Sequence, residues 1–245
     1  VAPFGTSRIR VRLAQALQLM LRNAAENNTA ADWLRLLGIW AALPRYHCNA
    51  RDINAMLASF VDNGVLPIIP QDLDGPAPQR RERNGEEASA DRRAAAERLA
   101  ACGRLSDAAR SLTSNGLAPV TTAPVTALRA LHPQGPAIND DFGDSLRVAP
   151  HVELSDELVQ RVLLQQKRNV KGGPSGITYD HLRCLCGVGG GVSALRSALQ
   201  CLIDGSVPSE ALPSLKASRL IALAKPGGGV RPIAIGEVFV RLAAR

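Results

Sequence analysis

The sequence predicts a mainly helical α+β protein that carries one small β-hairpin. Apolar residues recur at helical spacing through much of the 245-residue chain, as expected for helices that bury one face. Two β-prone runs, 220–223 and 230–235, flank a turn of one proline and three glycines, which is typical of a hairpin. Aromatic residues make up only 3% of the chain, so we expect a core of leucine, valine, isoleucine and alanine.

The N-terminal part is expected to form three amphipathic helices. They cover residues 8–25, 30–42 and 51–61. In the first of them Ile9, Leu13 and Leu17 share one face. Residues 67–87 are rich in proline, glycine and charge, which indicates a linker. We therefore expect a helical N-terminal region at 1–66.

Helical patterns continue beyond this linker. The predicted helices cover residues 88–102, 106–114, 124–132, 155–168 and 192–204, and further helices begin within 177–183 and after 236. Ser155 is a strong start signal, because its hydroxyl can cap a helix whose first turn carries Asp156 and Glu157. We divide this part of the chain into a helical region at 88–150 and a C-terminal region at 151–245.

The cysteines and the longest apolar runs bear on the protein's surroundings. Five cysteines at irregular spacing do not form an even disulfide framework and indicate a reducing, intracellular environment. His181, Cys184 and Cys186 could supply zinc ligands, but a fourth ligand is missing and they fall in helical sequence, so buried structural side chains are favoured. Apolar runs are far shorter than the about 20 residues that cross a bilayer, so no membrane contact is expected.

The positive charge is concentrated at the C-terminal end. Residues 167–245 contain 11 lysines and arginines against four acidic residues, whereas residues 1–166 contain 18 arginines, no lysine and 18 acidic residues. The whole net charge of +7 therefore lies in the last third. This distribution favours contact with a polyanion such as a nucleic acid or a nucleotide over a merely solubilising surface.

The hairpin turn combines cations with glycine. Lys225 precedes the turn and Arg231 follows it, and Gly227, Gly228 and Gly229 form its tip. Glycine lets a backbone come close to a ligand, and two cations suit a phosphate chain. From spacing alone an ordinary solvent-exposed hairpin is an equally good interpretation.

A second glycine-rich turn lies upstream, at 171–176. It leads into a predicted helix start, and Arg168 and Lys171 lie beside it. A basic turn at a helix N-terminus can contact phosphate groups of a nucleic-acid backbone.

Together these segments resemble a known family. Residues 171–183, KGGPSGITYDHLR, resemble the template-contacting segment that precedes the fingers in reverse transcriptases of non-LTR retrotransposons. Residues 218–237, SRLIALAKPGGGVRPIAIGE, resemble the first fingers motif of those enzymes. Residues 103–119, with Leu131-His-Pro133, are similar to their helical pre-fingers region. The resemblance covers roughly 95–245.

The resemblance implies that the C-terminal region is the fingers part of a right-hand polymerase. Lys225 and Arg231 would then hold the triphosphate of the incoming deoxynucleotide, and the glycine tip would let the hairpin close over it. Lys171, Ser175 and Gly176 would lie along the template strand. For Tyr179 we expect packing rather than base stacking. The implied partners are an RNA template, a DNA primer and a deoxynucleotide triphosphate, and the implied location is the nucleus.

The resemblance also sets a limit on activity. Reverse transcriptases hold two Mg²⁺ ions with palm carboxylates, and no segment here matches those motifs. We therefore expect a fragment with the palm absent, with no cofactor of its own and no catalysis alone, although the complete enzyme would need Mg²⁺. Two other hypotheses remain: a non-catalytic basic helical nucleic-acid-binding module, and a helical protein–protein scaffold. The sequence carries no signal for a particular oligomeric state.

Overall fold

The computed structural model describes residues 7–42, 50–63, 85–101, 103–113, 118, 121–131, 151–168, 170–225 and 228–245. The chain divides into two compact units. The first unit comprises Val1–Gln71, Gly135–Leu220 and Ala234–Arg245, and the second comprises Asp72–Gln134 and Ile221–Ile233.

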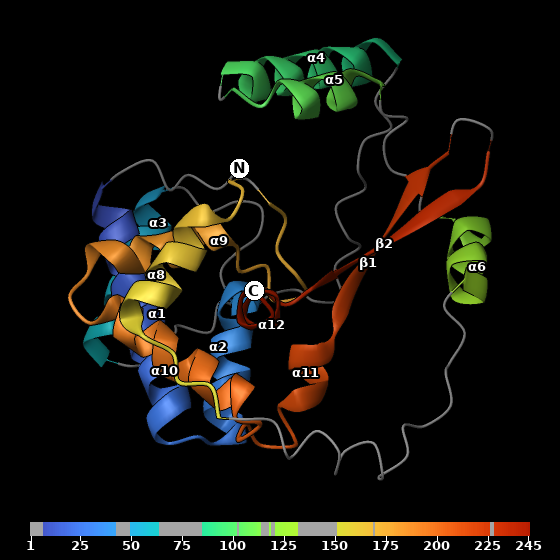
Figure 1. Ribbon diagram of the computed structural model, residues 1–245. Helices are drawn as coiled ribbons and strands as arrows, with labels where there is room; N and C mark the ends of the chain where they lie inside the picture. Colours follow the sequence, from blue (N-terminus) through green and yellow to red (C-terminus); the bar gives the residue numbers. More distant parts are fainter. Residues whose placement is uncertain are drawn as a thin grey trace. The chain divides into compact units, whose positions relative to one another are not determined.

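The first unit consists of a group of helices and the base of the hairpin (Figure 1). Its helices are α1 (Ser7–Glu26), α2 (Ala30–Ala42), α3 (Ala50–Asn63), α8 (Asp156–Gln165), α9 (Tyr179–Leu182), the 3₁₀ helix η1 (Arg183–Gly187), α10 (Gly191–Ile203), α11 (Leu212–Lys216) and α12 (Val238–Ala243). These bounds agree with the predicted helices to within a few residues, except that η1 and α11 are short elements that the apolar pattern did not predict.

Helix α1 lies at the centre of this core. It packs against α2, α3, α10 and η1. Leu13, Leu17 and Leu21 of α1 are fully buried and belong to the same apolar cluster as Leu195 of α10 and Leu163 of α8. The sequence treats 1–66 as a region of its own, whereas its described helices share one core with the C-terminal region.

Polar contacts anchor the same helices over long sequence separations. The Gln18 side-chain amide donates to the Gly189 carbonyl oxygen at 2.8 Å. The Asn28 amide donates to the Ser206 carbonyl at 2.8 Å and accepts from the Trp33 indole N–H at 2.9 Å. The turn between α1 and α2 is therefore attached to the segment that follows α10.

Helix α8 begins as predicted. The Ser155 hydroxyl accepts from the Leu158 N–H, and Asp156 and Glu157 lie in the first turn. The pKa of the Glu157 carboxyl is lowered by hydrogen bonds, chiefly from a backbone N–H and to a smaller extent from the Ser155 side chain. Asp156 also accepts from Arg196 Nε of α10 at 2.8 Å. The helix ends at Gln165, earlier than the predicted end near 168.

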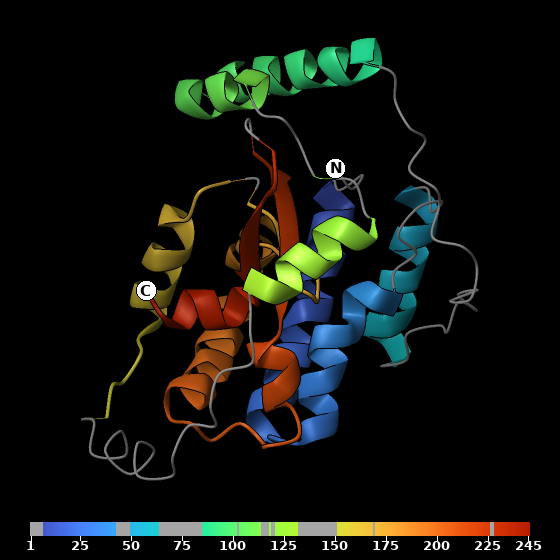
Figure 2. The same cartoon turned by 90° about the vertical axis from the view of Figure 1, so that its right-hand side faces the viewer.

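The second unit contains α4 (Gly85–Ala101), α5 (Leu105–Thr113), α6 (Thr122–Leu131) and the outer part of the hairpin. Helices α4 and α5 lie along one another (Figure 2). Helix α4 begins at Gly85, within the predicted linker, of which residues 67–84 lie outside the described part. Helix α5 begins one residue before the predicted start at Ser106.

Two strands, β1 (Ser218–Ala224) and β2 (Val230–Gly236), form an antiparallel hairpin. The Lys225 N–H donates to the Gly229 carbonyl at 3.2 Å, and the Gly228 N–H donates to the Lys225 carbonyl at 3.2 Å. The predicted fold class, mainly helical with one small hairpin, is confirmed. Among the described helices, none combines the length and the apolarity required to cross a membrane.

Candidate nucleic-acid interface

The loop at 171–177 is packed tightly against the base of the hairpin. Gly172 and Gly173 are both buried. A Cβ on Gly173 would lie 2.6 Å from the Gly236 carbonyl oxygen, and a Cβ on Gly172 would lie 2.6 Å from the Ile177 carbonyl oxygen. Since no real Cβ sits that close to backbone, only glycine allows this approach.

Ser175 is held by a buried carboxylate. Its N–H donates to Glu237 Oε1 at 2.6 Å, and its hydroxyl donates to Glu237 Oε2 at 2.5 Å. The Ser175 hydroxyl also accepts from the Ile177 N–H at 3.2 Å. Glu237 is 1% exposed and Ser175 is 9% exposed. The structure thus turns Ser175 inward, where it shapes the loop and does not point to solvent.

Sequence reasoning missed Glu237. It directly follows β2 and precedes the buried residues Val238 and Phe239. Its position between a strand and an apolar helix could have identified it, because a carboxylate that is buried in such a position is usually paired with a donor.

Arg241, one turn after Glu237, contacts the other end of the loop. Its Nη2 donates to the Lys171 carbonyl at 3.1 Å, and its guanidinium carbon lies 5.2 Å from the centre of the Tyr179 ring. Tyr179 is 5% exposed, which confirms the predicted packing role. The loop is therefore held at two points, by Glu237 at the N-cap of α12 and by Arg241 within α12.

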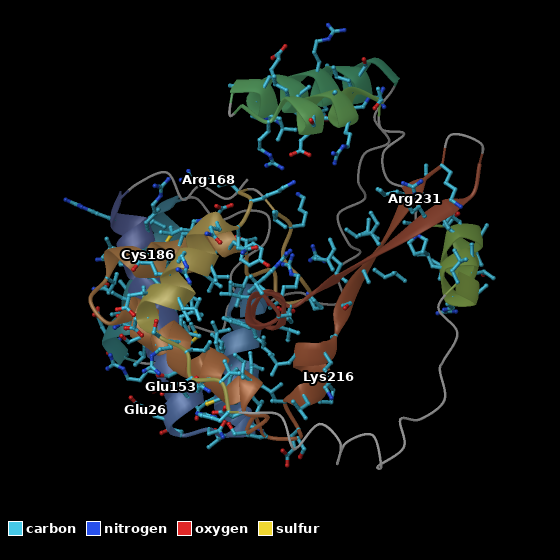
Figure 3. The ribbon with its side chains drawn as sticks, viewed as in Figure 1. Glu26, Glu153, Arg168, Cys186, Lys216 and Arg231 are labelled. Carbon is cyan, nitrogen blue, oxygen red and sulfur yellow. The ribbon has the colours of Figure 1, made fainter. Side chains whose placement is uncertain are left out.

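The cations predicted for the template are on the surface of the first unit. The side chains of Lys171 and Arg168 are exposed, and Arg168 lies beyond the end of α8 (Figure 3). Gly176 is half-buried with φ +79°, a left-handed conformation that favours glycine. Its N–H donates to the Gly173 carbonyl at 3.1 Å. Gly176 shapes the loop while the two cations face solvent.

The cations predicted for the nucleotide are on the outer part of the hairpin. Lys225 and Arg231 are exposed, and Figure 3 marks Arg231 on the hairpin. Continuing the pairing of Lys225 with Gly229 along the strands places Leu223 opposite Arg231. Because side chains alternate along a strand, Lys225 and Arg231 then belong to the same face. The two cations therefore lie on one face at the turn end of the hairpin.

The turn itself needs glycine at two described positions. Gly228 has φ +87° and Gly229 has φ +80°, and a Cβ on either would meet open space. Their requirement is therefore conformational. Gly227, also predicted at the nucleotide site, lies outside the described residues.

The cluster of His181, Cys184 and Cys186 has structural contacts. His181 Nδ1 accepts from the Thr178 N–H at 3.2 Å, and the Thr178 hydroxyl accepts from the His181 N–H at 3.3 Å, which forms a capping box for α9. Burial lowers the pKa of His181 to about 4. Burial raises the pKa of both thiols, and Cys184 Sγ donates to the Asp180 carbonyl at 3.5 Å. Within the described residues no three metal-ligating side chains gather.

Comparisons with known proteins return no relative. The chain matches no protein-family model, and neither the curated proteins nor the solved structures include a significant match.

Proposed function

We propose that this chain is the N-terminal extension and fingers part of a non-LTR retrotransposon reverse transcriptase, and that it contributes template and incoming-nucleotide contacts. The observation that carries the proposal is the Ser175–Glu237 pair, with distances of 2.6 and 2.5 Å. It joins the two segments on which the resemblance rests, 171–183 and 218–237. In a polymerase, a template-side loop and a nucleotide-side hairpin must act on the same base pair, so a direct connection between them is expected.

Lys225 and Arg231 are proposed to hold the triphosphate. Both are exposed and flank a glycine turn. Phosphoryl transfer develops negative charge on phosphate oxygens, which cations placed in advance can stabilise. The arginine fork suits two oxygens, while lysine acts as a mobile point charge.

Lys171 and Arg168 are proposed to contact template phosphates. The buried Ser175 and the half-buried Gly176 would contribute indirectly, by fixing the backbone of the loop that lies along the template. The expected nuclear location belongs to the same proposal and has the family resemblance as its support.

These residues alone are not expected to polymerise nucleotides. The two Mg²⁺ ions of the complete enzyme need palm carboxylates, and no segment of this sequence resembles the motifs that carry those carboxylates. Magnesium-dependent primer extension by the 245-residue chain would contradict this expectation.

The nucleotide role is tested by Lys225→Ala and Arg231→Ala in a polymerase that joins this chain to a palm. Each change removes charge-assisted hydrogen bonds worth about 1.5–3 kcal/mol, so the KM for deoxynucleotide should rise roughly tenfold or more, with template affinity nearly unchanged. Lys216→Ala and Arg219→Ala, which also remove exposed cations, are the matched controls.

The alternative, a nucleic-acid-binding module without chemistry, predicts a different result. Lys225→Ala and Arg231→Ala would then leave nucleotide kinetics unchanged. Each would instead make the negative slope of log affinity for RNA against log salt concentration shallower by about one.

A further inference from the structure

The base of the hairpin and the 171–177 loop are joined by one short helix. Glu237 directly follows β2 and binds Ser175, and Arg241, one turn later, binds the Lys171 carbonyl. Gly173 packs against the backbone of Gly236, where a Cβ would lie 2.6 Å from the carbonyl oxygen. Three independent contacts thus fix a loop more than sixty residues away in sequence.

The Glu237 contact differs from an ordinary surface pair. Its carboxylate is 1% exposed and accepts two hydrogen bonds from a single residue. Hydrogen bonds to an ionised group are short and strong, and a buried carboxylate that loses its donors pays the full cost of desolvation. The Ser175 hydroxyl extends the contact by accepting from the Ile177 N–H.

We infer that Glu237 is a positioning residue that makes the 171–177 loop and the hairpin base a single rigid body, and so sets the backbone from which Lys171 projects. Lys171 is exposed, but its own carbonyl is bound by Arg241. A displacement of the hairpin base would then displace Lys171 with it. The consequence for RNA rests on the proposed function, whereas the rigid connection does not.

The connection is tested by amide NMR on the 245-residue chain. A short bond to a carboxylate moves the Ser175 amide proton downfield and protects it from exchange. In Glu237→Gln we expect the Ser175 and Ile177 amides to exchange about tenfold faster and the Ser175 signal to move upfield. Ser175→Ala, a milder change, should speed exchange at Ile177.

Two controls separate this effect from charge and from general stability. Glu210→Gln removes the same charge from a glutamate that also accepts from a serine hydroxyl, at 3.1 Å, but is exposed. Leu199→Ala weakens the core on α10, where Leu199 is 2% exposed. Both should leave the Ser175 signal in place. Unchanged exchange at Ser175 and Ile177 in Glu237→Gln would overturn the inference.

RNA binding tests the functional consequence. With a labelled single-stranded RNA of about 20 nucleotides, Glu237→Gln should bind several-fold more weakly than Glu210→Gln. If both variants bound RNA equally well while the Ser175 and Ile177 amides of Glu237→Gln exchanged fast, Glu237 would have no positioning role in RNA binding. If the unaltered chain bound no RNA, the proposed function would fail, and the NMR result would still decide the rigid connection.

Discussion

At the scale of single residues, the environment of His181 makes it sensitive to acid. Its Nδ1 accepts a hydrogen bond from the Thr178 N–H, so a ring that is protonated at Nδ1 cannot keep the capping box. The ring is also largely removed from water, and this burial lowers its pKa to about 4. An unfolded chain would bind the same proton near pH 6.5.

This difference predicts how stability depends on pH. Because the folded pKa lies below the unfolded one, the contribution of His181 is complete above about pH 6.5 and is lost as the pH falls toward 4. The shift corresponds to a loss of about 3 kcal/mol. Urea unfolding at pH 7 and pH 4.5 measures it. His181→Gln, which keeps an acceptor, should reduce the pH dependence, and an undiminished dependence in that variant would contradict the assignment.

At the candidate site, the exposure of the cations could be predicted from the sequence, but the burial of Ser175 could not. The exposure of Lys225, Arg231 and Lys171 follows from their charge, so it could be anticipated. The inward direction of Ser175 could not, because a serine in a glycine turn suits solvent and a buried partner equally well. Its partner is 62 residues away in the chain, and local pattern carries no information about such a pair.

At the scale of elements, the helices followed from apolar periodicity and from cap residues. Ser155 marked the start of α8 correctly, whereas α6 begins at Thr122, two residues before its predicted start. The 177–183 segment was harder: α9 lasts only four residues and continues as η1. The segment is closely packed near its end, where a Cβ on Gly191 of α10 would lie 2.4 Å from the Leu185 carbonyl oxygen. Apolar periodicity carries no information about such tertiary contacts.

The cap of α8 gives a prediction at this scale. Ser155→Ala removes the acceptor for the Leu158 N–H and should lower the free energy of unfolding by about 1 kcal/mol. Ser155→Asp keeps an acceptor and adds favourable charge at the helix N-terminus, so it should cost much less. Thermal unfolding of the three proteins at pH 7 measures both effects. Equal losses in the two variants would argue against the cap.

At the scale of the whole molecule, the sequence divided the chain into consecutive regions, whereas the units interleave. Apolar periodicity indicates that a helix buries one face, but it does not identify the helix that covers that face. The two faces that meet here, on α1 and α10, are separated by more than 160 residues. Only the packed structure pairs them.

This organisation predicts unequal effects of two deletions. Removing residues 1–63 takes away α1 and leaves the apolar faces of α10 and η1 uncovered, so the remaining chain should lose cooperative unfolding. Removing residues 85–113 takes away α4 and α5 of the second unit and should change the melting temperature by only a few degrees. Differential scanning calorimetry compares the two. A sharp transition in the first deletion would contradict the shared core.

The contact between Gln18 and Gly189 also has a consequence for synthesis. The two residues are 171 positions apart, and a ribosome adds about 5–20 residues per second. Helix α1 therefore leaves the ribosome roughly ten to thirty seconds before the segment that covers it. During that interval the part of its apolar face that η1 and α10 later cover is open to chaperones and to other nascent chains. The yield of folded protein should therefore depend on how that part of the helix is shielded while translation continues.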